Sequence, residues 1–192
     1  MENPANFFGS GNVYAAVHTG ILQVSVQKGA TIMHHKNTLP PDPFQEKLAS
    51  SQELLAQIHR NLIMGSENLT NILPKVRNKF LLREITFQLE EYAAHTRQAV
   101  SLMSEYGVTP EKIGFMKSVM AKGGIALNTL IDDSDGHIAE MIRRGTNLGA
   151  SQLSKAVDRM AYRGCDDHVV QFGRAVVHFE RTGADRAGEY AG

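Results

Sequence analysis

The chain has 192 residues, of which 42% are hydrophobic, and its 20 basic residues balance its 20 acidic ones. This size and apolar content suffice for one domain with a hydrophobic core. Because no net charge attracts polyanions, we expect no binding to nucleic acid, to an anionic membrane or to an acidic substrate. The single cysteine, Cys165, is typical of a reducing compartment, and no apolar run reaches the about 20 residues of a membrane span, so we expect a cytoplasmic protein.

The N-terminal segment differs in composition from the rest of the chain. Residues 1–32 contain only two formal charges, Glu2 and Lys28, and show no sustained hydrophobic period. Two interpretations of residues 1–41 stay open. Either the segment is flexible, or residues 1–32 precede the true translation start at Met33, because the codons of Lys28, Gly29 and Ala30 could contain a bacterial ribosome-binding sequence. Both interpretations give it little role in the fold.

Two long helices are predicted after this segment. The first helix is predicted to begin with Asp42 as its N-cap and Pro43 at the first helical position. Leucines then recur every seven residues, a spacing that predicts one apolar stripe of a helical bundle. Pro74 interrupts the pattern, and a second helix is predicted from Lys79 to Tyr106.

Three further helices are predicted in the second half of the chain. The third covers about residues 110–130, the fourth about residues 136–162, and a shorter fifth begins near Asp166. Residues 183–192 are rich in glycine and charge and are expected to form a disordered tail. We therefore predict an all-α fold, an antiparallel four-helix bundle with a shorter fifth C-terminal helix, over residues 42–182.

The second helix carries polar residues close to its apolar stripe. Gln88 and His95 lie on or beside that stripe, and Glu91 shares a helix face with His95 because the two are four residues apart. A buried glutamine or histidine costs free energy unless it has partners. Two interpretations follow: a hydrogen-bonded polar layer that fixes the helix register, or a metal site.

A second candidate pair lies in the fourth helix. His137 and Glu140 are three residues apart, which can place both side chains on one metal ion. Alternatively, Glu140 pairs with Arg143 or Arg144 on the surface. The candidate metal ligands are Glu91, His95, His137 and Glu140.

Other residues carry expectations about packing. Gly145 and Gly149 are four residues apart, so we expect a neighbouring helix to approach that face closely. His178 and Glu180 in the last helix are expected on a solvated face. Cys165 precedes two aspartates, which disfavour a thiolate nucleophile.

Two stretches, residues 62–103 and the segment "DDSDGHIAEMIRRGTNLGASQLSKAV", resemble those of small uncharacterised bacterial helical-bundle proteins of the ferritin-like superfamily. The resemblance covers about Gln45 to Phe179. It implies a ferritin-like four-helix fold with an added C-terminal helix, but a fold does not determine an activity.

The same resemblance bears on metal chemistry. Di-iron members of the superfamily use one glutamate from each of two helices and a Glu-x-x-His pair from each of two others. Here Glu91 and His95 are one residue too widely spaced for that pair. We therefore expect a non-enzymatic bundle without a firm cofactor that acts through self-association or a helical protein partner. The alternative is a bundle that binds iron, manganese or zinc in oxidative stress or metal handling.

Overall fold

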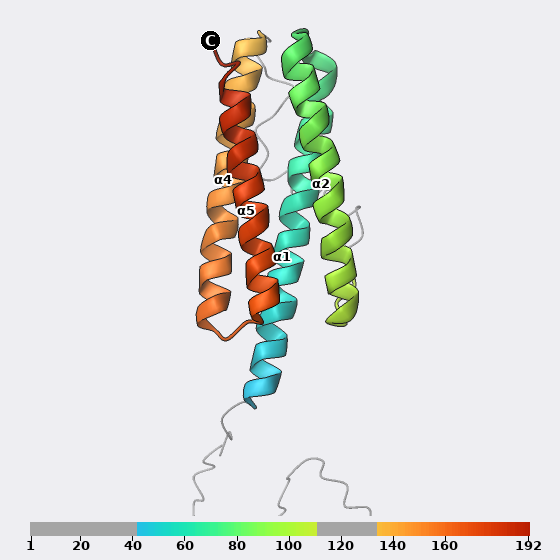
Figure 1. Ribbon diagram of the computed structural model, residues 1–192, viewed down its shortest axis with the longest axis vertical. Coiled ribbons are helices and arrows are strands. Elements are labelled where there is room, and N and C mark those ends of the chain that lie inside the picture. Colours follow the sequence, from blue (N-terminus) through green and yellow to red (C-terminus); the bar gives the residue numbers. More distant parts are fainter. Residues whose placement is uncertain (1–41, 111–133) are drawn as a thin grey trace, which may run out of the picture. The chain divides into compact units, whose positions relative to one another are not determined.

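The computed structural model describes residues 42–110 and 134–192. This described part contains four α-helices, one short 3-10 helix and no strand: α1 (Pro43–Ile72), η1 (Leu73–Lys75), α2 (Lys79–Glu105), α4 (Asp135–Tyr162) and α5 (Asp167–Gly188) (Figure 1). The predicted all-α class is therefore confirmed. The predicted N-terminal segment and third helix lie outside the described residues. Within the described part, no helix combines the length and apolar character that a bilayer crossing requires.

Local capping explains where the helices begin and end. Each α-helix follows an N-cap residue whose side chain accepts a hydrogen bond from a backbone N–H of the first turn: Asp42, Asn78, Ser134 and Asp166. Gly107 and Gly164, with φ of 69° and 76°, follow the ends of α2 and α4. Glycine adopts this left-handed conformation without steric cost, so the chain can leave the helix there.

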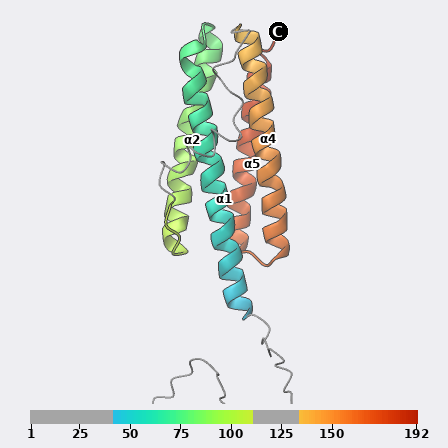
Figure 2. The same ribbon diagram turned by 180° about the vertical axis from the view of Figure 1, so that it is seen from behind.

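The four helices form a bundle in which α5 contacts α1, α2 and α4 (Figure 1), and α1 lies between α2 and α4 in the reverse view (Figure 2). Contacts of α5 with each neighbour establish the helix directions. From α1, Ser51 contacts Asp166 and Asn61 contacts Glu180, and from α2, Tyr92 contacts Glu180 and Glu84 contacts Arg186. From α4, Val157 lies next to Gly173 and Arg143 lies next to Gly188. Residue numbers rise in the same direction along α1 and α5, so these two helices are parallel. They rise in opposite directions along α5 and α2 and along α5 and α4, so α5 is antiparallel to both. Consequently α2 and α4 run in the same direction, and α2 ends at the opposite end of the bundle from the start of α4.

The apolar stripe predicted for the first helix is the centre of the core. Leu55, Leu62 and Leu69 are buried, and they belong to one cluster with apolar residues of α2, α4 and α5. Gly173 permits an especially close contact between α5 and α4, because an added Cβ there would lie 2.7 Å from a methyl group of Val157. The helices are therefore held by burial of apolar surface along their full common length.

The C-terminal helix corrects the prediction of a disordered tail from residue 183. It extends to Gly188, so the tail expected from residue 183 is helical over residues 183–188. Gly183, Ala184 and Ala187 are buried there, since small side chains fit where α5 meets its neighbours. Helix α5 contacts each of the other three described α-helices.

Candidate functional site: a buried polar cluster

A carboxyl group lies at the centre of the bundle. Glu180 of α5 is only 2% exposed. The side-chain amide of Asn61 in α1 donates a 2.8 Å hydrogen bond to Glu180 Oε1, and the Tyr92 hydroxyl in α2 donates a 3.1 Å bond to the same oxygen. These three residues, which we call the Glu180 cluster, join three helices through one carboxyl oxygen.

The other oxygen of the same carboxyl group faces α4. Glu180 Oε2 has no hydrogen-bond partner among the described residues. A Cβ added at Gly149 would lie 3.9 Å from this oxygen and 3.2 Å from Asn61 Oδ1, so both acceptors point toward a place where α4 carries no side chain. The predicted close approach is thus present at Gly149. At Gly145 no described part of the chain makes such an approach, because no described atom would lie within 4 Å of an added Cβ, and a contact with another copy of the chain there stays a prediction.

Burial changes the proton affinity of the cluster. Desolvation raises the pKa of Glu180 to about 7, and the hydrogen bonds from Asn61 and Tyr92 oppose this rise only in part. Desolvation also raises the pKa of the Tyr92 hydroxyl well above its usual value, and the neighbouring charge of Glu180 acts in the same direction. The carboxyl group can therefore gain or lose a proton near neutral pH while Tyr92 stays protonated.

Close packing on α1 and α5 holds Tyr92 in position. Gly65 of α1 faces the tyrosine, and a Cβ added there would lie 2.5 Å from its Cζ and hydroxyl oxygen. The ring meets Phe179 edge-on, with centroids 4.8 Å apart and an interplanar angle of 80°. The absence of a side chain at Gly65 therefore lets the hydroxyl reach Glu180.

A second polar group crosses from α2 to α5 near Gly183. The side-chain amide of Gln88, which is buried, donates hydrogen bonds to Gly183 O at 3.0 Å and to Glu84 Oε1 at 2.9 Å. Glu84 also pairs with Arg186 at 2.7 Å. The interpretation of Gln88 as part of a hydrogen-bonded layer is confirmed, because its amide bonds fix α5 relative to α2.

The first predicted metal pair lies beside aromatic rings. His95 is half-buried, and its ring centroid is 6.3 Å from that of Phe172 and 5.0 Å from that of Phe179. Desolvation lowers the pKa of His95, and the negative charge of Glu91 opposes this shift. A neutral imidazole with one nearby carboxylate provides two possible metal ligands, fewer than an iron or zinc site uses.

The second predicted pair lies at the surface of α4. His137 is exposed, and Glu140 accepts hydrogen bonds from Arg143 at 2.6 and 2.7 Å and from Arg144. These arginines lower the pKa of Glu140 to about 2. The surface pairing considered for Glu140 is therefore present.

The two predicted pairs do not come together. In the described residues, no group of three or more His, Cys, Asp or Glu side chains could hold a metal ion. Glu91 with His95 and His137 with Glu140 remain separate pairs on different helices, and metal binding by them stays a prediction.

Glu180 was missed because it was expected on a solvated face. The signal that could have found it is its spacing: it follows Val169, Gly173 and Val176 at intervals of four, three and four residues. An acidic residue at the next position of an apolar helical stripe is a candidate for burial. Asn61 has no comparable signal, because it is partly exposed beside the leucine stripe of α1.

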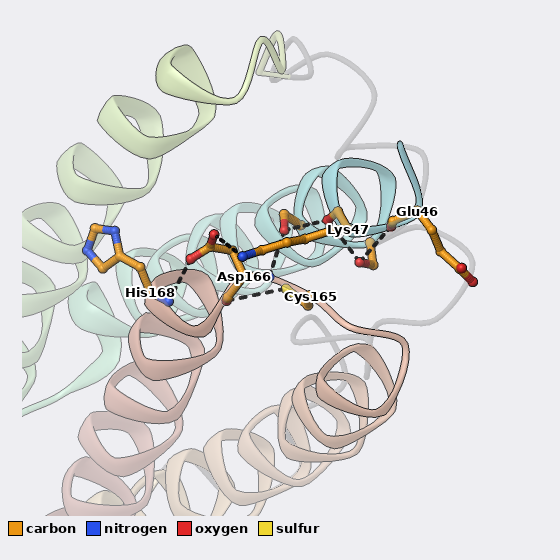
Figure 3. Close-up of polar contacts among 7 residues, drawn as sticks. Glu46, Lys47, Cys165, Asp166 and His168 are labelled. Carbon is orange, nitrogen blue, oxygen red and sulfur yellow. Dashed lines mark hydrogen bonds and ion pairs between the residues drawn. The ribbon is translucent and has the colours of Figure 1, made fainter. Parts of the chain in front are cut away.

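A different polar group fastens the turn between α4 and α5 to α1 (Figure 3). Asp166 pairs with Lys47 at 3.0 Å and accepts a hydrogen bond from the His168 backbone N–H, while its own N–H donates to Ser51 Oγ at 2.9 Å. The Lys47 contact is the main reason why the pKa of Asp166 is lowered. Burial raises the pKa of the adjacent Cys165 thiol, which disfavours a nucleophilic role. This group therefore holds the start of α5 in place.

Comparison with known proteins supplies no relative for this chain. No protein-family model, curated protein or solved structure matches it. The roles of the Glu180 cluster and of the surfaces are therefore inferred from their own geometry.

Proposed function

We propose that this chain is a ferritin-like helical-bundle protein of the cytoplasm that acts by self-association, without a catalytic centre of its own. The ferritin-like assignment is supported by the helix directions. Helices α1 and α2 form one antiparallel pair, α4 and α5 form another, and α2 and α4 run in the same direction, an arrangement that ferritin-like bundles share. The single cysteine supports a reducing compartment.

The composition of the bundle centre supports a non-catalytic role. In place of the carboxylate and histidine ligands of a di-iron centre, the Glu180 cluster combines one carboxyl group with an amide and a phenol. These groups join three helices through hydrogen bonds to one carboxyl oxygen. The proposal of self-association rests on a different observation, an apolar surface on α2.

The outer face of α2, defined here by Phe80, Arg83, Phe87 and Glu90, exposes two aromatic side chains. Phe80 is 71% exposed and Phe87 is 46% exposed. The two are seven residues apart, which places them on the same side of the helix. Exposed aromatic side chains on one face, with charges beside them, are typical of protein contact surfaces.

The charges on this face favour a second copy of the chain as the partner. Arg83 and Glu90 are exposed, and neither forms an ion pair with another described residue. If two α2 helices pack antiparallel, centred between Thr86 and Phe87, Arg83 of each copy faces Glu90 of the other. A two-fold axis makes this contact twice and places both Phe87 rings at the centre.

Charge exchange tests this arrangement. We expect the wild-type chain to form dimers in sedimentation-velocity runs over a range of concentrations. Arg83→Glu or Glu90→Arg alone should shift the protein toward monomer, because each places like charges opposite each other twice. An equimolar mixture of the two variants should form dimers again, since both contacts in the mixed pair join opposite charges. Lys155→Glu, a charge reversal on the exposed side of α4, is the matched control.

Two results would contradict the proposal in different ways. A wild-type chain that stays monomeric at every concentration would refute self-association. Dimers that neither variant weakens would show that the chain associates through a surface other than the outer face of α2.

A further inference from the structure

The surroundings of Glu180 match a carboxylic acid better than a carboxylate. One oxygen accepts two hydrogen bonds, but the other has no donor among the described residues and lies in a buried position. An ionised carboxylate has four lone-pair positions to satisfy and a charge to compensate, whereas its acid form has no net charge and carries its own donor. Burial of a charge without a compensating partner is costly, so this site favours a bound proton.

Within residues 42–110 and 134–192, the groups that face Glu180 provide no positive charge. Helix α1 presents the neutral amide of Asn61, α2 presents the protonated phenol of Tyr92, and α4 presents the backbone at Gly149. On α5 itself, the residues one turn away are small or apolar: Val176, Val177, Gly183 and Ala184. His95 of α2 packs on Phe179, the residue before Glu180, and its lowered pKa favours the neutral form.

We propose that Glu180 is a buried proton-binding site, and that release of its proton weakens the packing of α5 against α1, α2 and α4, so that the bundle responds to pH. The inference is independent of self-association, because the cluster lies inside a single chain. Its ligand is a proton. Release of this proton changes the stability of the bundle around neutral pH.

The Glu180 cluster borders partly exposed positions of α1 and α4. Asn61 and Gly149, which border the unpartnered oxygen, are both only half-buried. Gly145, one turn away along α4, is exposed, and no described atom lies within 4 Å of the position of its missing Cβ. The described residues that border this oxygen are therefore not all buried.

The sign of the pH effect follows from linkage. Burial moves the pKa of Glu180 from 4.5 to about 7, so the folded chain holds the proton more tightly than the unfolded chain. The resulting stabilisation is complete below pH 4.5 and is lost as the pH rises through 7. The difference of about 2.5 pH units corresponds to a rise of roughly 300-fold in the equilibrium constant for unfolding.

A direct test follows the carboxyl carbon. In full-length protein labelled with ¹³C at glutamate Cδ, one resonance should titrate near pH 7 and should be missing from the Glu180→Gln spectrum. If no glutamate resonance of the wild-type protein titrates above pH 6, the proposal is wrong, and this result does not depend on the folding of the variant. Addition of sodium or zinc chloride distinguishes a cation from a proton: a midpoint that these salts lower would show that a cation occupies the site, which would also overturn the proposal.

A second measurement tests the effect on stability. Urea unfolding between pH 5 and 9 should show a loss of wild-type stability that is missing in Glu180→Gln, whose neutral amide cannot titrate. Glu67→Gln, at a half-buried position of α1, is the matched control and should keep the wild-type pH dependence. If Glu180→Gln retains that dependence, another group binds the proton.

Discussion

Gly65→Ala tests whether the close packing of α1 on Tyr92 holds the centre of the bundle together. The added Cβ would lie 2.5 Å from Cζ and from the hydroxyl oxygen of Tyr92, which is too short for a stable contact. The ring cannot move away freely, because it is buried, packs edge-on against Phe179 and donates a hydrogen bond to Glu180. Either α1 shifts or this hydrogen bond is lost.

The expected magnitude combines three contributions. Alanine in place of glycine inside a helix favours folding by about 1 kcal/mol. Overpacking of a tight core contact costs about 1–3 kcal/mol. Displacement of the Tyr92 hydroxyl from Glu180 costs roughly 1 kcal/mol more, the usual net contribution of a hydrogen bond. We therefore expect a net destabilisation of about 1–3 kcal/mol, with a melting temperature lower by roughly 2–4 °C for each kcal/mol.

Urea unfolding followed by far-ultraviolet circular dichroism measures this change. Gly145→Ala is the matched control, since its added Cβ meets no described atom within 4 Å. This variant should gain up to about 1 kcal/mol from helix propensity alone, the opposite of the effect expected from the sequence. In the Gly65→Ala background, Tyr92→Phe should recover part of the lost stability because it removes one of the clashing atoms. A Gly65→Ala protein as stable as its parent would show that the ring adjusts freely, and the packing argument would fail.

Asp166→Ala should lower the free energy of unfolding by about 1–2 kcal/mol at pH 7, measured by urea titration, because it removes the N-cap of α5 and the contact with Lys47. Since the pKa of Asp166 is lowered in the folded chain, the difference from the parent should shrink as the pH falls below 3.8, and a constant difference would contradict this. Elemental analysis of tag-free protein should find no stoichiometric iron, manganese or zinc. A stoichiometric metal that is lost from the His95→Ala, Glu140→Ala double variant would instead favour the metal-handling alternative.

Short-range signals in the sequence were enough to predict most of the helix boundaries. Asp42 with Pro43 marks the start of α1, and Gly107 follows the end of α2 as its sequence predicts. The leucine spacing correctly predicts the buried side of α1. These features could be predicted because capping and hydrophobic periodicity depend on residues within one or two helical turns.

The burial of Gln88 was also accessible from the sequence, but the identity of its partners was not. The stripe of α2 places this side chain near the core, and a buried amide requires hydrogen-bond partners. The observed acceptor, Gly183 O, is 95 residues away in a segment whose composition resembles a disordered tail. Contact with α2 makes that segment part of the helix, since small residues allow the close approach that Gln88 requires.

Only the tertiary structure decided the nature of the central site. Asn61 and Glu180 are 119 residues apart in the chain, and Tyr92 and Glu180 are 88 apart, so no local pattern predicts that they meet. The proton affinity of Glu180 depends on the desolvation that three other helices provide. Its second oxygen has no described hydrogen-bond partner because the neighbouring position of α4, Gly149, carries no side chain. The sequence alone determined that these residues lie in helices, whereas the packing of α5 against its neighbours turned an apparently solvated glutamate into a buried acid.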